Sequence, residues 1–247
     1  MSSFKLLFLP FYAFEQIIKT MELIDVYDLS QVSKKTFNLV KLTKRRIQPI
    51  KVVNVERDQV VEISENANSR TRLLFNETYL VLGPRIQLGN REIDSRKKGL
   101  DFHFYVQDFN DHFGELVNYL SELFHNNSTV FWIRHTKLSG VEPVMRNRVF
   151  DNCVSLKVTV HPDFDGPGIK RKYLNMLLQN KPHLESLMLT SWIEDPEKFK
   201  HVLDIPRVFI RNGEWIKIED LMNCNGEIIH LEWHVANTTM RAIELTT

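Results

Sequence analysis

The hydrophobic periodicity of this 247-residue chain changes once, near residues 47–49, and this change constrains its fold more than any other feature. Before the change, apolar side chains recur at the three- and four-residue spacing of helices. After it, short apolar runs alternate with helical segments. The break at Ile47–Pro49 therefore predicts a boundary between a small helical module over residues 1–48 and a larger region over residues 49–247. A chain of this length has room for both parts and for a packed core in the larger one.

The first 48 residues are predicted to form three short helices. Pro10 suits a first helical turn, where its missing N–H is not needed. Asp25 and Ser33 are candidate caps of a second and a third helix. Eight basic and four acidic side chains in the first fifty residues give this segment a positive balance. Because three helices in about forty residues bury little surface, they must pack against the larger region, a partner, or both.

The larger region is predicted to alternate strands and helices. Strands are expected at residues 52–63, 72–82, 100–106, 129–134, 155–160, 186–190, 207–211 and 228–233, the last being the final strand. Helices are expected at residues 113–125, 170–180, 196–203 and 218–223, and the polar residues 88–98 are expected to form a loop. The strands of the second half recur at intervals of about 20 to 30 residues, and the spacing of Leu184, Leu187 and Leu189 resembles the strand of a leucine-rich repeat. The predicted fold class is α/β (α+β): a three-helix module followed by an irregular, leucine-rich-repeat-like solenoid with a parallel sheet.

No catalytic or cofactor motif is found in the sequence. Phosphate-binding glycine loops, the nucleophile elbow and the H-E-x-x-H zinc motif are all missing. Cys153 and His161 lie on or beside one predicted strand, too far apart for a nucleophile and its base. Residues 163–166 begin like a calcium loop, but the position that needs a glutamate is Leu174. The chain is therefore expected to be no enzyme and to bind neither a metal nor a cofactor.

Cysteine content and charge bear on compartment and partners. Two cysteines, Cys153 and Cys224, suit a reducing compartment. The apolar residues 4–14 are interrupted by Lys5 and Pro10 and are too short to span a membrane. A cytoplasmic or nuclear location with no membrane partner is expected. A net charge of +1 gives no general attraction to nucleic acid, and the basic run at residues 41–46 is interpreted as a solvated helix end.

Residues 9–40 resemble an F-box. The family pattern begins with Leu-Pro, continues with an isoleucine seven residues after the proline and a large aliphatic residue four later, and ends with Val-Ser-Lys before a helix that carries an aromatic residue. This chain has Leu9-Pro10, Ile17, Met21, Val32-Ser33-Lys34 and Phe37. Nematode members of the family are nearer still. The region downstream is similar to the nematode F-box-associated domain of the second type, through residues 215–221 (WIKIEDL) and 187–192 (LMLTSW).

The resemblance implies a substrate-recognition subunit of a Skp–cullin–F-box ubiquitin ligase. Its F-box would bind the Skp-type adaptor and, through it, a cullin, and its C-terminal domain would bind a target protein for ubiquitination. The residues that correspond to the adaptor-binding pattern are Leu9, Pro10, Ile17, Met21, Leu29, Val32 and Phe37. Ser33 is expected to cap a helix.

Side chains that alternate with core leucines in a solenoid sheet face its open surface. This alternation predicts a target-binding set consisting of Met188, Thr190, Trp192, Arg211, His230 and Glu232. The alternative is an adaptor-independent repeat protein that binds protein or nucleic acid and uses its first helices only as a cap. The two hypotheses differ at Leu9, Pro10 and Ile17, which docking requires to be exposed and capping requires to be buried.

Overall fold

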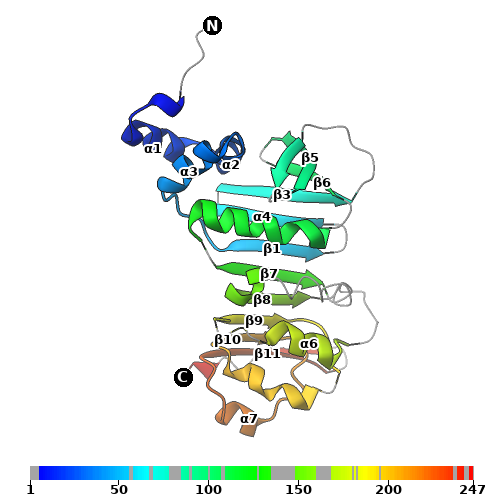
Figure 1. Cartoon of the computed structure of the whole chain (residues 1–247). Coiled ribbons are helices and arrows are strands. Elements are labelled where there is room, and N and C mark those ends of the chain that lie inside the picture. Colours follow the sequence, from blue (N-terminus) through cyan, green and yellow to red (C-terminus); the bar gives the residue numbers. More distant parts are fainter. Residues whose placement is uncertain are drawn as a thin grey trace. The chain divides into compact units, whose positions relative to one another are not determined.

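The computed structural model describes residues 6–55, 58–66, 69–77, 85–88, 91–99, 101–106, 109–126, 128–134, 148–159, 168–179, 181, 183–194, 196–235, 238–241 and 245–246. The protein is α/β: three short helices precede strands of mixed direction with helices between them (Figure 1). The chain divides into two compact units. The first comprises residues 1–52 and 58–128, and the second comprises residues 53–57 and 129–247.

The first unit begins with a single-turn 3₁₀ helix, η1 (Leu6–Phe8), and three α-helices, α1 (Phe11–Thr20), α2 (Leu23–Gln31) and α3 (Lys34–Leu42). The predicted three helices are confirmed. Ser33 caps α3 as predicted, because its hydroxyl accepts the Thr36 main-chain N–H at 3.1 Å. Asp25 does not cap α2. It lies in the first turn, since the helix starts earlier, at the buried residues Leu23 and Ile24.

The strands of the first unit are β1 (Ile50–Val55, whose first three residues belong to this unit), β2 (Asp58–Asn66), β3 (Ser69–Glu77), β4 (Arg85–Leu88), β5 (Arg91–Lys98) and β6 (Asp101–Val106). Their order is β1-β2-β3-β6-β5-β4. Strands β3 and β6 run parallel, whereas the β2–β3, β6–β5 and β5–β4 pairs are antiparallel. The prediction of a loop at residues 88–98 is wrong for residues 91–98, because pairing with β4 and β6 holds these polar residues in strand β5.

Aromatic side chains hold the N-terminal helices to the rest of the first unit. The helix α4 (Phe109–Phe124) packs against β2 and β3. Tyr27 of α2 is fully buried, and its ring meets the rings of Phe102, Phe104 and Tyr119 edge-on at 5.7 to 6.4 Å between centroids. Phe37 of α3 lies 5.0 Å from the Tyr119 ring of α4. Helices α2 and α3 therefore share a core with α4 and this sheet.

The strands of the second unit are β7 (Thr129–Arg134), β8 (Cys153–Thr159), β9 (Ser186–Leu189), β10 (Arg207–Ile210) and β11 (Ile228–Val235), which lie side by side in chain order and are all parallel. Two short strands, β12 (Thr238–Arg241) and β13 (Leu245–Thr246), pair antiparallel with β11. The expectation that residues 228–233 form the final strand is therefore wrong. The helical segments are η3 (Arg148–Asn152), α6 (Arg171–Leu178), η4 (Pro196–Asp204) and α7 (Ile218–Met222).

The core of the second unit lies between one face of its sheet and these helical segments. Every second residue of β7, β9 and β10 is buried on this side, and β8 follows the same alternation from Leu156 onward. Leu174 and Leu177 of α6 and Phe199 and Val202 of η4 are also buried, and α6 lies over the sheet in Figure 1. The predicted parallel sheet is thus found in the second unit, whereas the first unit is mixed. The boundary at residue 48 stays a prediction.

Candidate functional site

The N-terminal helices leave large apolar side chains in contact with solvent. Helix α1 buries Phe14 and Ile18 on its inner face. Its first turn and the preceding η1 point outward, with Phe8 79% and Tyr12 73% exposed. The Lys35 ammonium lies 6.0 Å from the centre of the Phe8 ring, so η1 lies beside the start of α3. We call the exposed apolar residues of this module the N-terminal apolar surface: Phe8, Phe11, Tyr12, Val32 and Leu42.

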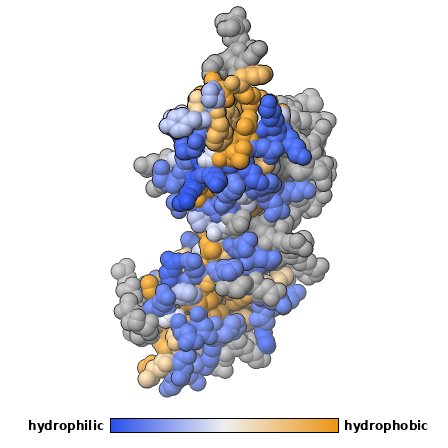
Figure 2. Space-filling view, turned by 60° about the vertical axis from the view of Figure 1, so that its left-hand side comes forward, coloured by the Kyte–Doolittle hydropathy of each residue, from blue (hydrophilic) through white to orange (hydrophobic). Residues whose placement is uncertain are grey.

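Figure 2 turns this side of the molecule forward and shows hydrophobic side chains gathered over the N-terminal helices, bordered by hydrophilic ones. A contiguous exposed apolar patch with a polar rim marks an interaction site more often than a random surface does. The geometry therefore offers a protein-binding surface on the helical module.

None of the seven predicted adaptor-binding residues is buried. Pro10 and Val32 are exposed, and Val32 reaches 71%. The other five are half-buried: Leu9, Ile17, Met21, Leu29 and Phe37. Phe37 also contacts Tyr119, so part of its ring supports the packing of α3 on α4. Sequence reasoning did not select the exposed rings of Phe8, Phe11 and Tyr12, although they belong to the apolar run at residues 4–14.

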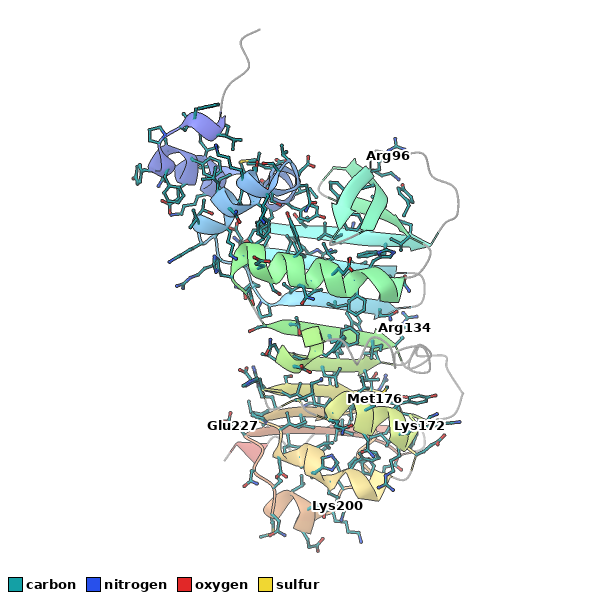
Figure 3. The ribbon with its side chains drawn as sticks, viewed as in Figure 1. Arg96, Arg134, Lys172, Met176, Lys200 and Glu227 are labelled. Carbon is teal, nitrogen blue, oxygen red and sulfur yellow. The ribbon has the colours of Figure 1, made fainter. Side chains whose placement is uncertain are left out.

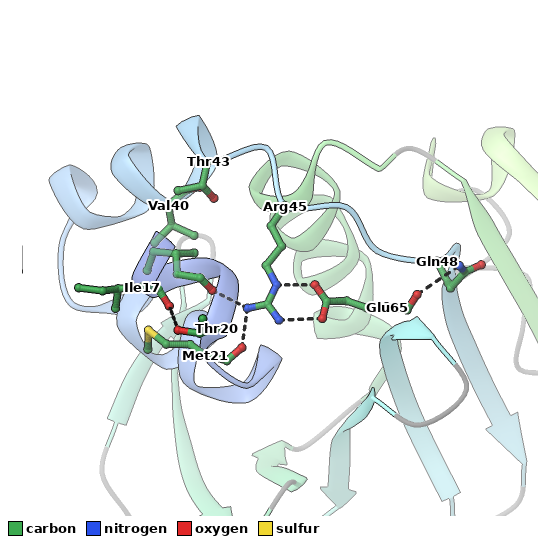
Figure 4. Close-up of polar contacts among 9 residues, drawn as sticks. Ile17, Thr20, Met21, Val40, Thr43, Arg45, Gln48 and Glu65 are labelled. Atoms are coloured by element: carbon green, nitrogen blue, oxygen red, sulfur yellow. Dashed lines mark hydrogen bonds and ion pairs between the residues drawn. The ribbon is translucent and has the colours of Figure 1, made fainter. Parts of the chain in front are cut away.

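One charged side chain fixes the end of α1 to the sheet of the first unit (Figure 4). The Arg45 side chain is only 6% exposed, and its guanidinium donates to both carboxylate oxygens of Glu65 in β2, at 2.5 and 2.8 Å. The same guanidinium donates to the main-chain carbonyls of Ile18 and Met21 at 2.7 and 2.6 Å. These carbonyls have no further helical partner at a helix end, so Arg45 positions α1 and its apolar residues.

A second candidate surface is the face of the parallel sheet in the second unit that the helical segments do not cover, here called the open face. As predicted from strand alternation, Leu187 and Leu189 are buried while Met188 and Thr190 between and beside them are half-exposed. Of the remaining predicted residues, Arg211, His230 and Glu232 are half-exposed, and Trp192 is 54% exposed. Trp192 lies beyond the end of β9.

Three half-exposed residues of the open face were missed by sequence reasoning: Trp132, Lys157 and Phe209. Strand register places Trp132 opposite Lys157, Lys157 opposite Met188, and Phe209 between Met188 and His230. The alternation in residues 129–134 contained the signal for Trp132. The neighbours of Trp132 on the face could not be predicted in this way, because they depend on which distant strands pair, and only the fold shows this.

The described residues contain no group of three or more histidine, cysteine or acidic side chains that could hold a metal ion. Cys153 is buried in β8, its thiol donates to the Ser155 carbonyl at 3.2 Å, and burial raises its pKa, which disfavours the reactive thiolate. His161 and the calcium-like residues 163–166 lie outside the described residues. No helix of the described part is long and apolar enough to cross a membrane.

Comparisons of this chain with protein-family models, with curated proteins and with solved structures gave no match.

Proposed function

We propose that this chain is the substrate-recognition subunit of a Skp–cullin–F-box type ubiquitin ligase. The observation that carries the proposal is the N-terminal apolar surface, together with the exposure of Pro10 and Val32 from the F-box-like pattern. Several exposed apolar side chains gathered on one module are typical of an interaction surface. The resemblance of residues 9–40 to an F-box supplies the identity of the partner, the Skp-type adaptor.

In this proposal the second unit is a leucine-rich-repeat-like solenoid that holds the target protein. Its support is the chain-order arrangement of five parallel neighbouring strands, each joined to the next through helical segments that cover one face. The opposite face carries the predicted target-binding residues Met188, Arg211, His230 and Glu232. The mechanism is proximity without catalysis by this chain: the receptor raises the local concentration of the target near a ubiquitin-charged enzyme.

Co-purification with a Skp-type adaptor tests the proposal. The informative variant is Pro10→Ala/Val32→Glu, because both side chains are exposed and their replacement leaves the core intact. The matched control is Met222→Glu in α7, an apolar residue that is 80% exposed in the other unit. Wild type and control are expected to retain the adaptor, and the double variant is expected to lose at least about tenfold in affinity.

Circular dichroism and thermal unfolding of each variant separate loss of binding from loss of fold. Failure of the folded wild type to bind the adaptor would overturn the proposal. Equal binding by the wild type and the double variant would also overturn it, because the F-box-like surface would then have no part in the interaction.

The second candidate is an adaptor-independent binding protein whose first helices form part of the first unit's own structure. The burial of Tyr27 among Phe102, Phe104 and Tyr119 favours it, since these contacts join the helices to a sheet without any partner. The two candidate functions make different predictions for the exposed residues of the helical module. Docking requires Val32 and its neighbours to be covered in a complex, whereas a purely structural module tolerates Val32→Glu with no loss of any function.

A further inference from the structure

The open face of the second unit carries a continuous row of side chains that crosses all five parallel strands. Register aligns one residue from each strand, in the order Trp132, Lys157, Met188, Phe209, His230. All five are half-exposed. The Lys157 ammonium lies 4.4 Å from the centre of the Trp132 ring, and the rings of Phe209 and His230 stack at 4.8 Å with 15° between their planes. The row is a mainly apolar stripe with one cation in it.

Basic residues flank this stripe on both sides. Next to it toward the C-terminal ends of the strands lie Arg134, labelled in Figure 3, and Arg211. Arg207 lies on the other side, where it pairs with Glu185 at 3.1 Å. The one carboxylate among the described strand residues of these rows is Glu232, 3.8 Å from Arg211 and 3.7 Å from His230. On and beside the stripe, the described residues therefore carry four basic side chains, Lys157, Arg134, Arg207 and Arg211, against two carboxylates, Glu185 and Glu232. This described part of the face has an excess of positive charge around an apolar centre, although the whole chain is almost neutral.

We propose that the open face binds an extended acidic segment of the target protein, one that places apolar side chains on the central stripe and carboxylates against the flanking basic residues. This inference rests on the proposed function, which makes the second unit the target-binding part. Charge complementarity of this kind gives specificity and fast association, and aromatic and arginine side chains are the residue types that anchor protein interfaces.

The geometry favours a polypeptide over single-stranded nucleic acid. Bases bind by stacking on free aromatic faces. Here one face of the Trp132 ring is covered by Lys157, and the rings of Phe209 and His230 cover each other. The carboxylates of an acidic peptide, by contrast, can bind through the guanidinium and ammonium groups of the face and require no free aromatic ring. Five strands about 4.8 Å apart span about 19 Å, which an extended segment of about six residues covers.

The test is fluorescence anisotropy of the full-length chain with a labelled peptide of about twelve alternating glutamate and leucine residues, twice the expected span. A lysine–leucine peptide of equal length and a single-stranded oligothymidine of similar length are the comparison probes. The acidic peptide is expected to bind, with an affinity that falls as salt is raised. The charge-reversal variant Lys157→Glu/Arg211→Glu is expected to weaken binding by at least about tenfold, and Met188→Ala gives a second, uncharged probe of the stripe.

The matched control is Arg171→Glu/Lys172→Glu, which reverses two exposed charges on α6, on the helical side of the sheet (Figure 3). It is expected to bind like the wild type. Equal losses in both double variants, no binding of the acidic peptide by the folded wild type, or tighter binding of the oligothymidine at this face would each overturn the inference. Co-purification with the adaptor is measured on the same proteins. Adaptor binding without peptide binding refutes this inference alone, and peptide binding without adaptor binding refutes only the ligase role.

Discussion

Arg45 and Glu65 form a bidentate ion pair that joins the segment after α3 to strand β2, twenty residues further along the chain. The pair differs from an ordinary surface ion pair because the same guanidinium also binds two carbonyls at the end of α1. Arg45 thereby links two parts of the first unit: the helical module that carries the N-terminal apolar surface and the sheet beside it.

Replacing Arg45 is expected to destabilise the first unit. Arg45→Ala leaves two main-chain carbonyls and the Glu65 carboxylate without their donor, and we expect the free energy of unfolding to fall by about 2–4 kcal/mol. Arg45→Lys should recover only part of this loss, because an ammonium cannot form the same planar bidentate contact. Chemical denaturation measures both. Arg46→Ala, at the exposed neighbouring position, is the control and should stay within about 0.5 kcal/mol of the wild type; an equal loss there would show that Arg45 has no special role.

The raised pKa of Tyr119 predicts how the free energy of unfolding changes at alkaline pH. Burial, with a smaller contribution from Glu122, raises the pKa of Tyr119 to about 12, although its hydrogen bond with Ser30 opposes the shift. An unfolded tyrosine ionises near pH 10. Unfolding therefore releases a proton between about pH 10 and 12, so the contribution of Tyr119 is complete below pH 10 and is lost as the pH rises through this range.

Denaturation curves recorded across this range are expected to show a falling free energy of unfolding, with a shallower fall in Tyr119→Phe. Part of the fall should persist in that variant, since burial also raises the pKa of Tyr27 well above its ordinary value. Tyr119→Phe should also cost about 1 kcal/mol near neutral pH through the lost hydrogen bond to Ser30. Identical slopes for the wild type and Tyr119→Phe would contradict the assignment.

Local patterns in the sequence were sufficient to predict the five parallel strands of the second unit, but not the short strands β12 and β13. Strands β7 to β11 each contain an alternation or a short apolar run between turn residues, so residues 129–134 and 186–189 were recognised correctly. The Ser33 cap was recognised because a cap acts within four residues of chain. Local patterns did not predict the strand at residues 91–98. These residues form a strand because they pair with β4 and β6, and they have no apolar face of their own.

The candidate sites show the same division between local and long-range information. Val32 and Pro10 could be selected from a short motif. The grouping of Lys157, Trp132 and Phe209 on one face could not be predicted, because it depends on the register of strands whose residues lie 25 to 77 positions apart in the chain. Arg45 was part of a basic run that was interpreted as solvated. Its burial accompanies a bidentate ion pair with Glu65 of β2, which lies twenty residues further along the chain and outside any local pattern.

The two cysteines are expected to differ in reactivity. Cys153 is buried with a raised thiol pKa, whereas Cys224 is half-exposed, its thiol donating to the Leu221 carbonyl at 3.1 Å. A thiol-alkylating reagent should therefore modify Cys224 in the native protein and reach Cys153 only after unfolding. Mass spectrometry of time points locates the label, and Cys224→Ser leaves only the slow site. Equal rates at both cysteines in the native protein would show that β8 is not packed as described.

Gly226 should be one of the least replaceable residues of the second unit. A Cβ atom at this position would collide with the main-chain carbonyl oxygen of Leu203, near the end of η4, and lie 3.1 Å from that of Ile205, directly after η4. The segment cannot shift easily to make room, because Glu227 and Ile228 both donate main-chain N–H groups to the Pro206 carbonyl at 2.9 Å.

Gly226→Ala is therefore expected to lower the free energy of unfolding by about 1–3 kcal/mol, the usual cost of forcing extra atoms into a packed site. Glu227→Ala is the matched control, since its side chain is exposed and its main-chain bond survives the substitution. Thermal and urea unfolding of the two variants beside the wild type measure the difference. A Gly226→Ala protein as stable as Glu227→Ala would mean that the turn into β11 is not held against η4, and the position of β11 at the end of the row on the open face would have to be reconsidered.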